Sequence, residues 1–233
     1  MRCVGILGGM GPEATVLLMR RVIDAVPARD DADHVPLLVD QNPQVPSRIA
    51  RLIEGRGEDP GPVLADMARR LEAAGATALA MPCNTAHHFA PAIRSASSVP
   101  FLDMVALSVR RAAEAAPPSG RIGILASPAV RRTALFEPAL AAAGLSAVYP
   151  SDEDALLAAI REIKSAGPTP TAIAAVRGAS AELATAGAPL QLVACTEFSL
   201  LDAPGAAGAR LLDTLDLLVE VIVAHASGDQ AAR

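Results

Sequence analysis

The chain has 233 residues, of which 52% are hydrophobic, 19% charged and 2% aromatic, and its formal net charge is -5. This length fits two domains of about 100–120 residues with a sizeable buried interior. The negative charge and the scarcity of aromatic side chains argue against a nucleic-acid-binding surface.

The first half of the chain alternates between short apolar runs and helical patterns. Apolar runs predict strands at residues 3–7, 35–40 and 78–82. Helical spacing of apolar residues, with Pro12 suited to a first turn, predicts helices over 12–26, over 60–74 and directly after Cys83. The run at 3–7 is closed by Gly8 and Gly9 and is too short for a secretory signal or a membrane span, so we expect neither.

The second half repeats this alternation. It predicts strands at 121–127 and 190–195 and helices over 130–143, 152–166 and 208–226. Continuous apolar strands that alternate with helices are typical of parallel sheets covered by helices. The predicted fold class is therefore α/β.

The two halves also resemble each other. Residues 4–15 align with 122–133, and 79–85 align with 192–198, each of the latter pair being a strand that delivers a cysteine. We interpret this as a duplicated α/β unit, with a first domain of 1–104 plus 207–233 and a second of 105–206. Open α/β sheets bind ligands at the carboxyl ends of their strands. If the units face one another, two thiols reach one cleft from opposite sides.

The cysteines are Cys3, Cys83 and Cys195. An odd number of cysteines without an export signal is typical of free thiols in a reducing cytoplasm, where we expect the protein to reside.

Metal binding finds little support in the sequence. Cys83 and His87 are four residues apart and could share a helical face, but neither a CxxC nor an HExxH pattern supplies further ligands. His87 and His88 are adjacent, so they point about 100° apart on a helix. We predict that one lies at the surface and that the other is a hydrogen-bonded packing residue.

Two cofactor sites are alternatives. Gly9 to Ala14 fits the loose form GxGxxA and Asp40 ends the next strand, but it lies nearly thirty residues beyond the glycines rather than about twenty. The glycines equally suit a tight turn before the helix. Pyridoxal chemistry would need Lys164, the single lysine, as Schiff base, and no glycine-rich phosphate cup lies near it in sequence.

Three interpretations of the cysteines remain open. Cys83 could be a nucleophile with His87 or His88 as its base, which leaves Cys195 without a purpose. Both could be buried structural residues. Alternatively, two thiols at strand-to-helix junctions, where helix N-termini stabilise thiolates, could act as base and acid on opposite faces of a carbon acid.

Three segments carry a family resemblance: "GILGGMGPEAT" (5–15), "MPCNTAHHF" (81–89) and "ACTEFSLL" (194–201). In this order and spacing they resemble the aspartate/glutamate racemase superfamily, and its aspartate racemase branch most. The resemblance implies two similar α/β domains related by pseudo-two-fold symmetry, with the active site in the cleft between them. It also implies a two-base mechanism without metal or organic cofactor, an amino-acid substrate, and commonly a homodimer.

The resemblance also assigns site residues. Cys83 and Cys195 match the paired acid/base thiols, with Cys83 serving the D-enantiomer as base and Cys195 the L-enantiomer. The residues that match substrate-binding positions are Met10, Arg48, Asn84, Thr85, Lys164 and Thr196. An Arg and a Lys suit a dicarboxylate, so aspartate is the expected substrate, with glutamate behind it.

Residues 126–136 depart from the family pattern. Ala129 and Val130 stand where Gly and Thr are expected, and Phe136 replaces a Tyr, whereas Ser127 keeps one hydroxyl nearby. Arg131 and Arg132 lie either on a solvated helix face or at the pocket.

The departure bears on the exact substrate more than on the mechanism. Rival functions are also open. They are racemisation of a different amino acid, a maleate-type cis-trans isomerase or a decarboxylase of the same superfamily, and a catalytically idle binding protein.

Overall fold

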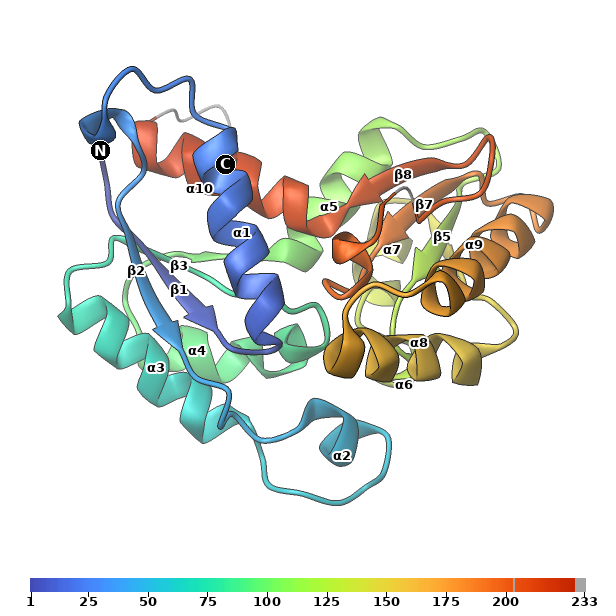
Figure 1. Cartoon of the computed structure of the whole chain (residues 1–233), viewed down its shortest axis with the longest axis horizontal. Helices are drawn as coiled ribbons and strands as arrows, with labels where there is room; N and C mark the ends of the chain where they lie inside the picture. The colour runs from blue at the N-terminus through green and yellow to red at the C-terminus, as the bar shows by residue number, and fades with distance from the viewer. Residues whose placement is uncertain (203, 229–233) are drawn as a thin grey trace. The chain divides into compact units, whose positions relative to one another are not determined.

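The computed structural model describes residues 1–202 and 204–228. The chain divides into two compact units: Met1–Met104 together with the chain from Leu215 onward, and Val105–Thr214. Each unit contains one four-stranded parallel sheet with helices packed on it (Figure 1). The predicted α/β class is confirmed.

The first unit is built on β1, which pairs with β2 on one side and β3 on the other. Its strands are β1 (Val4–Gly8), β2 (Leu37–Gln41), β3 (Ala78–Ala80) and β4 (Phe101–Leu102). Its helices are α1 (Pro12–Asp24), α2 (Arg48–Leu52), α3 (Gly61–Ala73), α4 (Ala90–Ala96) and α10 (Thr214–Ser227), with short 3₁₀ helices η1 (Asp31–Asp33) and η2 (Thr85–Phe89).

Side chains on the two faces of this sheet pack against different helices. Leu7 and Leu79 point into a cluster with Leu64, Met67 and other apolar residues of α3 and α4. Strand alternation sends Val4 and Ile6, both fully buried, to the opposite face. Figure 1 shows α1 and α10 together away from α3 and α4, and an ion pair of 2.9 Å joins Arg21 of α1 to Asp216 of α10.

The second unit repeats this plan around β5. Its strands are β5 (Arg121–Leu125), β6 (Ser146–Val148), β7 (Leu190–Val193) and β8 (Arg210–Asp213). Its helices are α5 (Met104–Glu114), α6 (Pro128–Arg132), α7 (Glu137–Ala142), α8 (Glu153–Ala166) and α9 (Pro170–Thr185), and a short 3₁₀ helix η3 (Phe198–Leu200) follows β7.

The second sheet is also covered on both faces. Leu125 and Val193 pack in a cluster with apolar residues of α8 and α9. Ile124 and Leu192, which point the other way, pack with residues of α5, α6 and α7. Burial of both faces explains why these strands are uninterrupted apolar runs in the sequence.

The strand order is the same in both sheets, β2-β1-β3-β4 and β6-β5-β7-β8. In each unit the first strand therefore lies between the second and the third, so that the chain after the first and third strands emerges at one edge of the sheet. This agrees with the duplication seen in the sequence. The pseudo-two-fold relation of the units stays a prediction.

Two predicted helices are wrong in part. The helix expected over 130–143 is two helices, because Pro138 lies in the first turn of α7 and cannot continue a helix from α6. Ala134, between them, takes a left-handed conformation with φ 48°. The helix expected over 208–226 begins as strand β8, which pairs with β7 in register from Leu190 and Arg210 onward. That pairing puts residues 207–214 in the second unit rather than the first.

Candidate active site

Each candidate thiol follows the third strand of its unit. Cys83 lies three residues after the end of β3 and Cys195 two residues after the end of β7. Both are free and buried, with 8% and 7% of the residue exposed. The two units thus present one cysteine each at the carboxyl edge of the sheet, where parallel sheets place ligands.

The glycine loop that follows β1 packs against the segment that follows β2, and both contribute to the cluster that contains Cys83. Gly9 has φ 94°, and a Cβ at this position would lie 2.4 Å from the carbonyl carbon of Asn42, so only glycine fits. The Gly9 amide donates to Thr15 Oγ1 at 2.9 Å, which ties the loop to α1. The next residue, Met10, packs in the same buried cluster as Val45 and Cys83.

Arg48 is held at this edge by the loop that precedes it. It is the first residue of α2, which Ser47 caps through its side chain. Its Nη1 donates to the carbonyl oxygens of Val45 at 3.3 Å and Pro46 at 3.1 Å. Val45 packs in the same buried cluster as Met10 and Cys83, so Arg48 is anchored to a loop that contributes to this cluster.

Asn84 and Thr85 follow Cys83 directly at the start of η2. Asn84 is buried and Thr85 is half-buried. The predicted residues of the first unit therefore follow three neighbouring strands: Met10 follows β1, Arg48 follows β2, and Asn84 and Thr85 follow β3 together with Cys83.

His87 holds the backbone of Cys83. Its Nδ1 lies 2.8 Å from the Cys83 carbonyl oxygen, and its Nε2 lies 3.1 Å from the Met104 amide nitrogen. A carbonyl can only accept and an amide N–H can only donate, so Nδ1 carries the proton and Nε2 is the acceptor. Both ring nitrogens are engaged, and the suggestion that His87 is the base for Cys83 is wrong.

Burial is the main reason that the pKa of His87 lies below its ordinary value, and the nearby Asp103 carboxylate opposes the shift. The ring is therefore neutral in the folded protein. His88 is exposed. The prediction of one surface histidine and one hydrogen-bonded packing histidine is confirmed.

The residues of the alternative cofactor sites have other roles. Asp40 pairs with Arg70 of α3, whose Nη2 lies 2.7 Å from the carboxylate. Within residues 1–202 and 204–228, no three His, Cys, Asp or Glu side chains lie close enough together to hold a metal ion.

Every helix in the part of the chain that the structure describes is too short or too polar to span a membrane.

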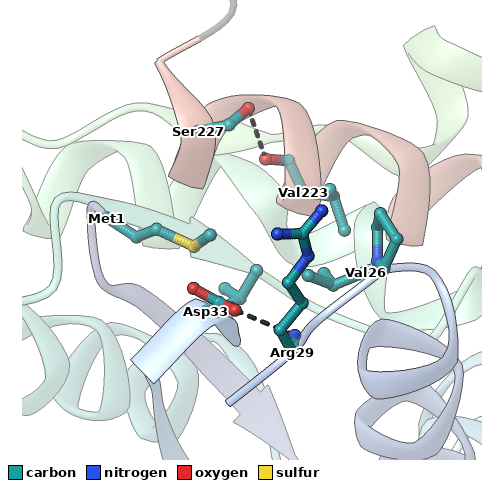
Figure 2. Close-up of a pocket in the computed structure, with 8 residues that line it drawn as sticks. Met1, Val26, Arg29, Asp33, Val223 and Ser227 are labelled. Atoms are coloured by element: carbon teal, nitrogen blue, oxygen red, sulfur yellow. Dashed lines mark hydrogen bonds between the residues drawn. The ribbon is translucent and has the colours of Figure 1, made fainter. Parts of the chain in front are cut away.

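A cavity in the first unit lies away from the thiol. It has a volume of about 470 Å³ and is lined by residues near the ends of α1 and α10, among them Val26, Arg29, Val223 and Ser227 (Figure 2). Met1 and Val35, which precede β1 and β2, also line it. It is therefore at the amino edge of the sheet, opposite to the edge that carries Cys83.

Cys195 takes part in a chain of three polar side chains in the second unit. Its Sγ lies 3.1 Å from Glu197 Oε2. The other oxygen of this carboxylate, Oε1, accepts from Lys164 Nζ of α8. Thr196, which lies between Cys195 and Glu197 in the sequence, is buried. Glu197 thus connects Lys164 to Cys195. The substrate-binding roles of Lys164 and Thr196 stay predictions, and Glu197 was not among the predicted site residues.

The environment of Cys195 differs from that expected for a thiolate. Burial, followed by the Glu197 charge, raises the pKa of Cys195 well above its ordinary value, and Lys164 opposes the shift. The expected support from a helix N-terminus is small here, because the chain continues into the three-residue η3 rather than an α-helix. The Cys195 sulfur is therefore protonated in the free protein.

The departures at 126–136 fall mostly outside this site. Val130 and Phe136 are fully buried in the apolar cluster between β5 and helices α5–α7. Arg131 is exposed, lies 3.6 Å from Glu153 and stacks over Tyr149, so it belongs to the helix surface. Ser127, at the end of β5, remains as a buried hydroxyl at the edge that carries Cys195.

Comparison with known proteins supports this organisation. The family model for Asp/Glu/Hydantoin racemase matches residues 7–222. A 150-residue segment is 29% identical to the broad specificity amino-acid racemase RacX of Bacillus subtilis and covers 63% of either chain. The match thus spans less than two thirds of that relative's length.

Solved structures share the fold. An aspartate racemase from Picrophilus torridus superposes with a TM-score of 0.87 over 97% of this chain and 95% of its own, at 24% identity. A glutamate racemase from Bacillus anthracis gives a TM-score of 0.69 over 99% of this chain and 84% of its own, at 17% identity. With a family model that matches nearly its whole length, the chain belongs to the Asp/Glu/Hydantoin racemase family.

Proposed function

We propose that this protein is a racemase of an acidic amino acid, with aspartate as the preferred substrate and glutamate behind it, that needs no metal or organic cofactor. The observation that carries the proposal is the similar position of Cys83 and Cys195, each free, buried and within three residues of the end of the third strand of its unit. Family membership supports the reaction class.

The proposed mechanism uses the two thiols as base and acid on one α-carbon. One thiolate removes the α-hydrogen, and the other thiol returns a proton from the opposite face, so that inversion follows. The carbanion-like intermediate is stabilised by cations and by backbone N–H groups. The mechanism requires both thiols to reach the same substrate molecule.

Two cations support a dicarboxylate as substrate. Arg48 lies at the edge that carries Cys83, and Lys164 lies beside Glu197 and Cys195. A guanidinium binds a planar carboxylate in two places, whereas an ammonium acts as a point charge. One cation for each carboxylate, or both for one carboxylate, would select an acidic amino acid over a neutral one.

A broader amino-acid specificity is the second candidate. The similarity to a relative described as a broad specificity amino-acid racemase favours it. Under this alternative the thiol chemistry is the same and the side chain of the substrate is not selected by charge.

The test is incubation of the protein with L-aspartate in D₂O, without added cofactor and with hydroxylamine present to trap pyridoxal phosphate. We expect D-aspartate that carries deuterium at the α-carbon, measured by chiral chromatography with mass spectrometry. The control is the Cys3→Ser variant, because Cys3 directly precedes β1, at the end of the strand opposite to the edge that carries Cys83.

Other results would contradict the proposal in distinct ways. D-amino acids formed from neutral or basic substrates at equal rates would favour the broad-specificity candidate. Conversion of maleate to fumarate, with no racemisation of any amino acid, would replace the racemase proposal by a cis-trans isomerase.

We also propose that the protein is a homodimer that acts in the cytoplasm, as family resemblance suggests. Sedimentation would report about twice the chain mass of 23.8 kDa for the dimer. A monomer that racemises aspartate would contradict it.

A further inference from the structure

Glu197 connects the two functional side chains of the second unit. Its carboxylate contacts Cys195 Sγ through Oε2 at 3.1 Å and Lys164 Nζ through Oε1. The Glu197 side chain is only 9% exposed, and the Lys164 side chain is 36% exposed. The positive charge of Lys164 therefore compensates the negative charge of a carboxylate that is largely removed from water.

These contacts determine where the proton lies. An ammonium donates only, and the carboxylate that it neutralises is ionised and accepts only. The hydrogen between Cys195 and Glu197 must then be on sulfur, since a thiolate at 3.1 Å from a carboxylate would put two like charges together. Glu197 and Lys164 both act electrostatically on this thiol, and Asp213, which pairs in register with Val193 of β7, accepts from Ser199 Oγ.

The position that matches Glu197 in the first unit holds an uncharged side chain. Glu197 lies two residues after Cys195, and the residue two positions after Cys83 is Thr85. The carbonyl of Cys83 is held instead by the neutral His87. The two thiols thus follow the third strands of their sheets, and the residues around them differ: a carboxylate contacts the Cys195 sulfur, whereas a neutral histidine holds the Cys83 carbonyl.

We propose that Glu197 is a positioning residue that holds Cys195 as a proton donor in the free protein, so that Cys83 is the thiol that begins as the base. This inference rests on the racemase function proposed above. It deepens that function by assigning unequal starting roles to two thiols that the fold places alike.

The proton balance of one turnover follows from this assignment. The Cys83 thiolate takes the α-hydrogen as a proton, and the electron pair of the C–H bond stays on the substrate. The S–H bond of Cys195 then breaks and its proton joins the α-carbon from the opposite face. Between turnovers, Cys195 regains a proton from water and Cys83 releases one to water.

The experiment measures the pH midpoint for alkylation of each cysteine by iodoacetamide, with peptide mass spectrometry to separate the three sites and no substrate present. The variants are Glu197→Gln, which keeps the shape and removes the charge, and Glu197→Asp, which keeps the charge. The control is Glu182→Gln, a carboxylate of the same unit that accepts from the Ser151 amide.

We expect the midpoint of Cys195 to fall by at least about one pH unit in Glu197→Gln, because a neighbouring anion shifts a titration by this much or more. It should stay high in Glu197→Asp and in Glu182→Gln, and the midpoint of Cys83 should not move in any variant. Thermal unfolding of each variant reports whether it is folded.

An unchanged midpoint in Glu197→Gln, or an equal fall in both Glu197 variants, would overturn the inference. Neither result involves a substrate. A failure of the wild-type protein to racemise amino acids would therefore contradict the proposed function and leave this result intact.

Discussion

His87 Nδ1 donates to the carbonyl oxygen of Cys83 at 2.8 Å, and the same ring accepts from the Met104 amide at 3.1 Å through Nε2. One neutral tautomer therefore joins the loop that carries a candidate catalytic thiol to the start of α5. The histidine contributes to the site by fixing the backbone at Cys83, and it is not a proton acceptor for the sulfur.

The neutral state of His87 predicts a pH dependence of stability. Burial lowers the pKa of His87, so below about pH 6.5 the unfolded chain binds a proton that the folded protein does not. The contribution of neutral His87 to the free energy of unfolding is fully present above that pH. It is lost as the pH falls, by up to about 1.4 kcal/mol per pH unit. Urea unfolding of the wild-type protein at several pH values should give this slope.

The matched pair of variants is His87→Gln and His88→Gln, since His88 is exposed. The slope should disappear in the first and persist in the second. A slope that survives His87→Gln would assign the dependence to other groups.

Gly9 should be the least replaceable glycine of the first unit. In Gly9→Ala, the added Cβ meets the backbone of Asn42 at 2.4 Å, and φ of 94° strains any L-residue. We expect a loss of about 3 kcal/mol or more in the free energy of unfolding. Gly178→Ala is the control, because its Cβ meets nothing within 4 Å inside α9, and it should gain about 0.5–1 kcal/mol.

Strands and thiols could be predicted from the sequence because their signals are local. The apolar runs at β1, β5 and β7 reflect burial of both sheet faces, and the cysteines follow such runs directly. Strands β4 and β6 were not predicted, since they have two and three residues and are largely half-buried. Helix α9 was not predicted either, because its alanine-rich sequence has little contrast between its faces.

The partners of the thiols could not be predicted in the same way. Glu197 is significant through Lys164, which is 33 residues away in sequence. His87 Nε2 is an acceptor because the Met104 amide, 17 residues away, donates to it. A sequence motif identifies candidate side chains, whereas their protonation states depend on contacts that only the folded chain makes.

The two thiols should each be essential under the proposed mechanism. Cys83→Ser and Cys195→Ser should each lower kcat/KM for racemisation by about 10²–10⁴-fold, because a hydroxyl is a poor acid and base at neutral pH. Each variant should still exchange the α-hydrogen of one enantiomer slowly in D₂O, a different enantiomer for each. Normal racemisation by both variants would rule out the two-thiol mechanism.

The unequal thiols should also appear in steady-state kinetics. Racemisation has an equilibrium constant of one, so kcat/KM must be equal for the two enantiomers at every pH, and any asymmetry lies in kcat and KM separately. A free protein with Cys195 protonated can react directly with the enantiomer whose α-hydrogen faces Cys83. Family resemblance identifies this enantiomer as the D-form. We therefore expect a lower KM and a proportionally lower kcat for D-aspartate than for L-aspartate.

The Glu197→Gln variant should bring this KM ratio closer to one, since it removes the charge that keeps Cys195 protonated. Glu182→Gln should leave the ratio at its wild-type value, because Glu182 binds the Ser151 amide rather than a thiol. A ratio that is unchanged in Glu197→Gln would mean that the asymmetry comes from how tightly each enantiomer binds. In that case the protonation of Cys195 would have no influence on which enantiomer the free protein accepts first.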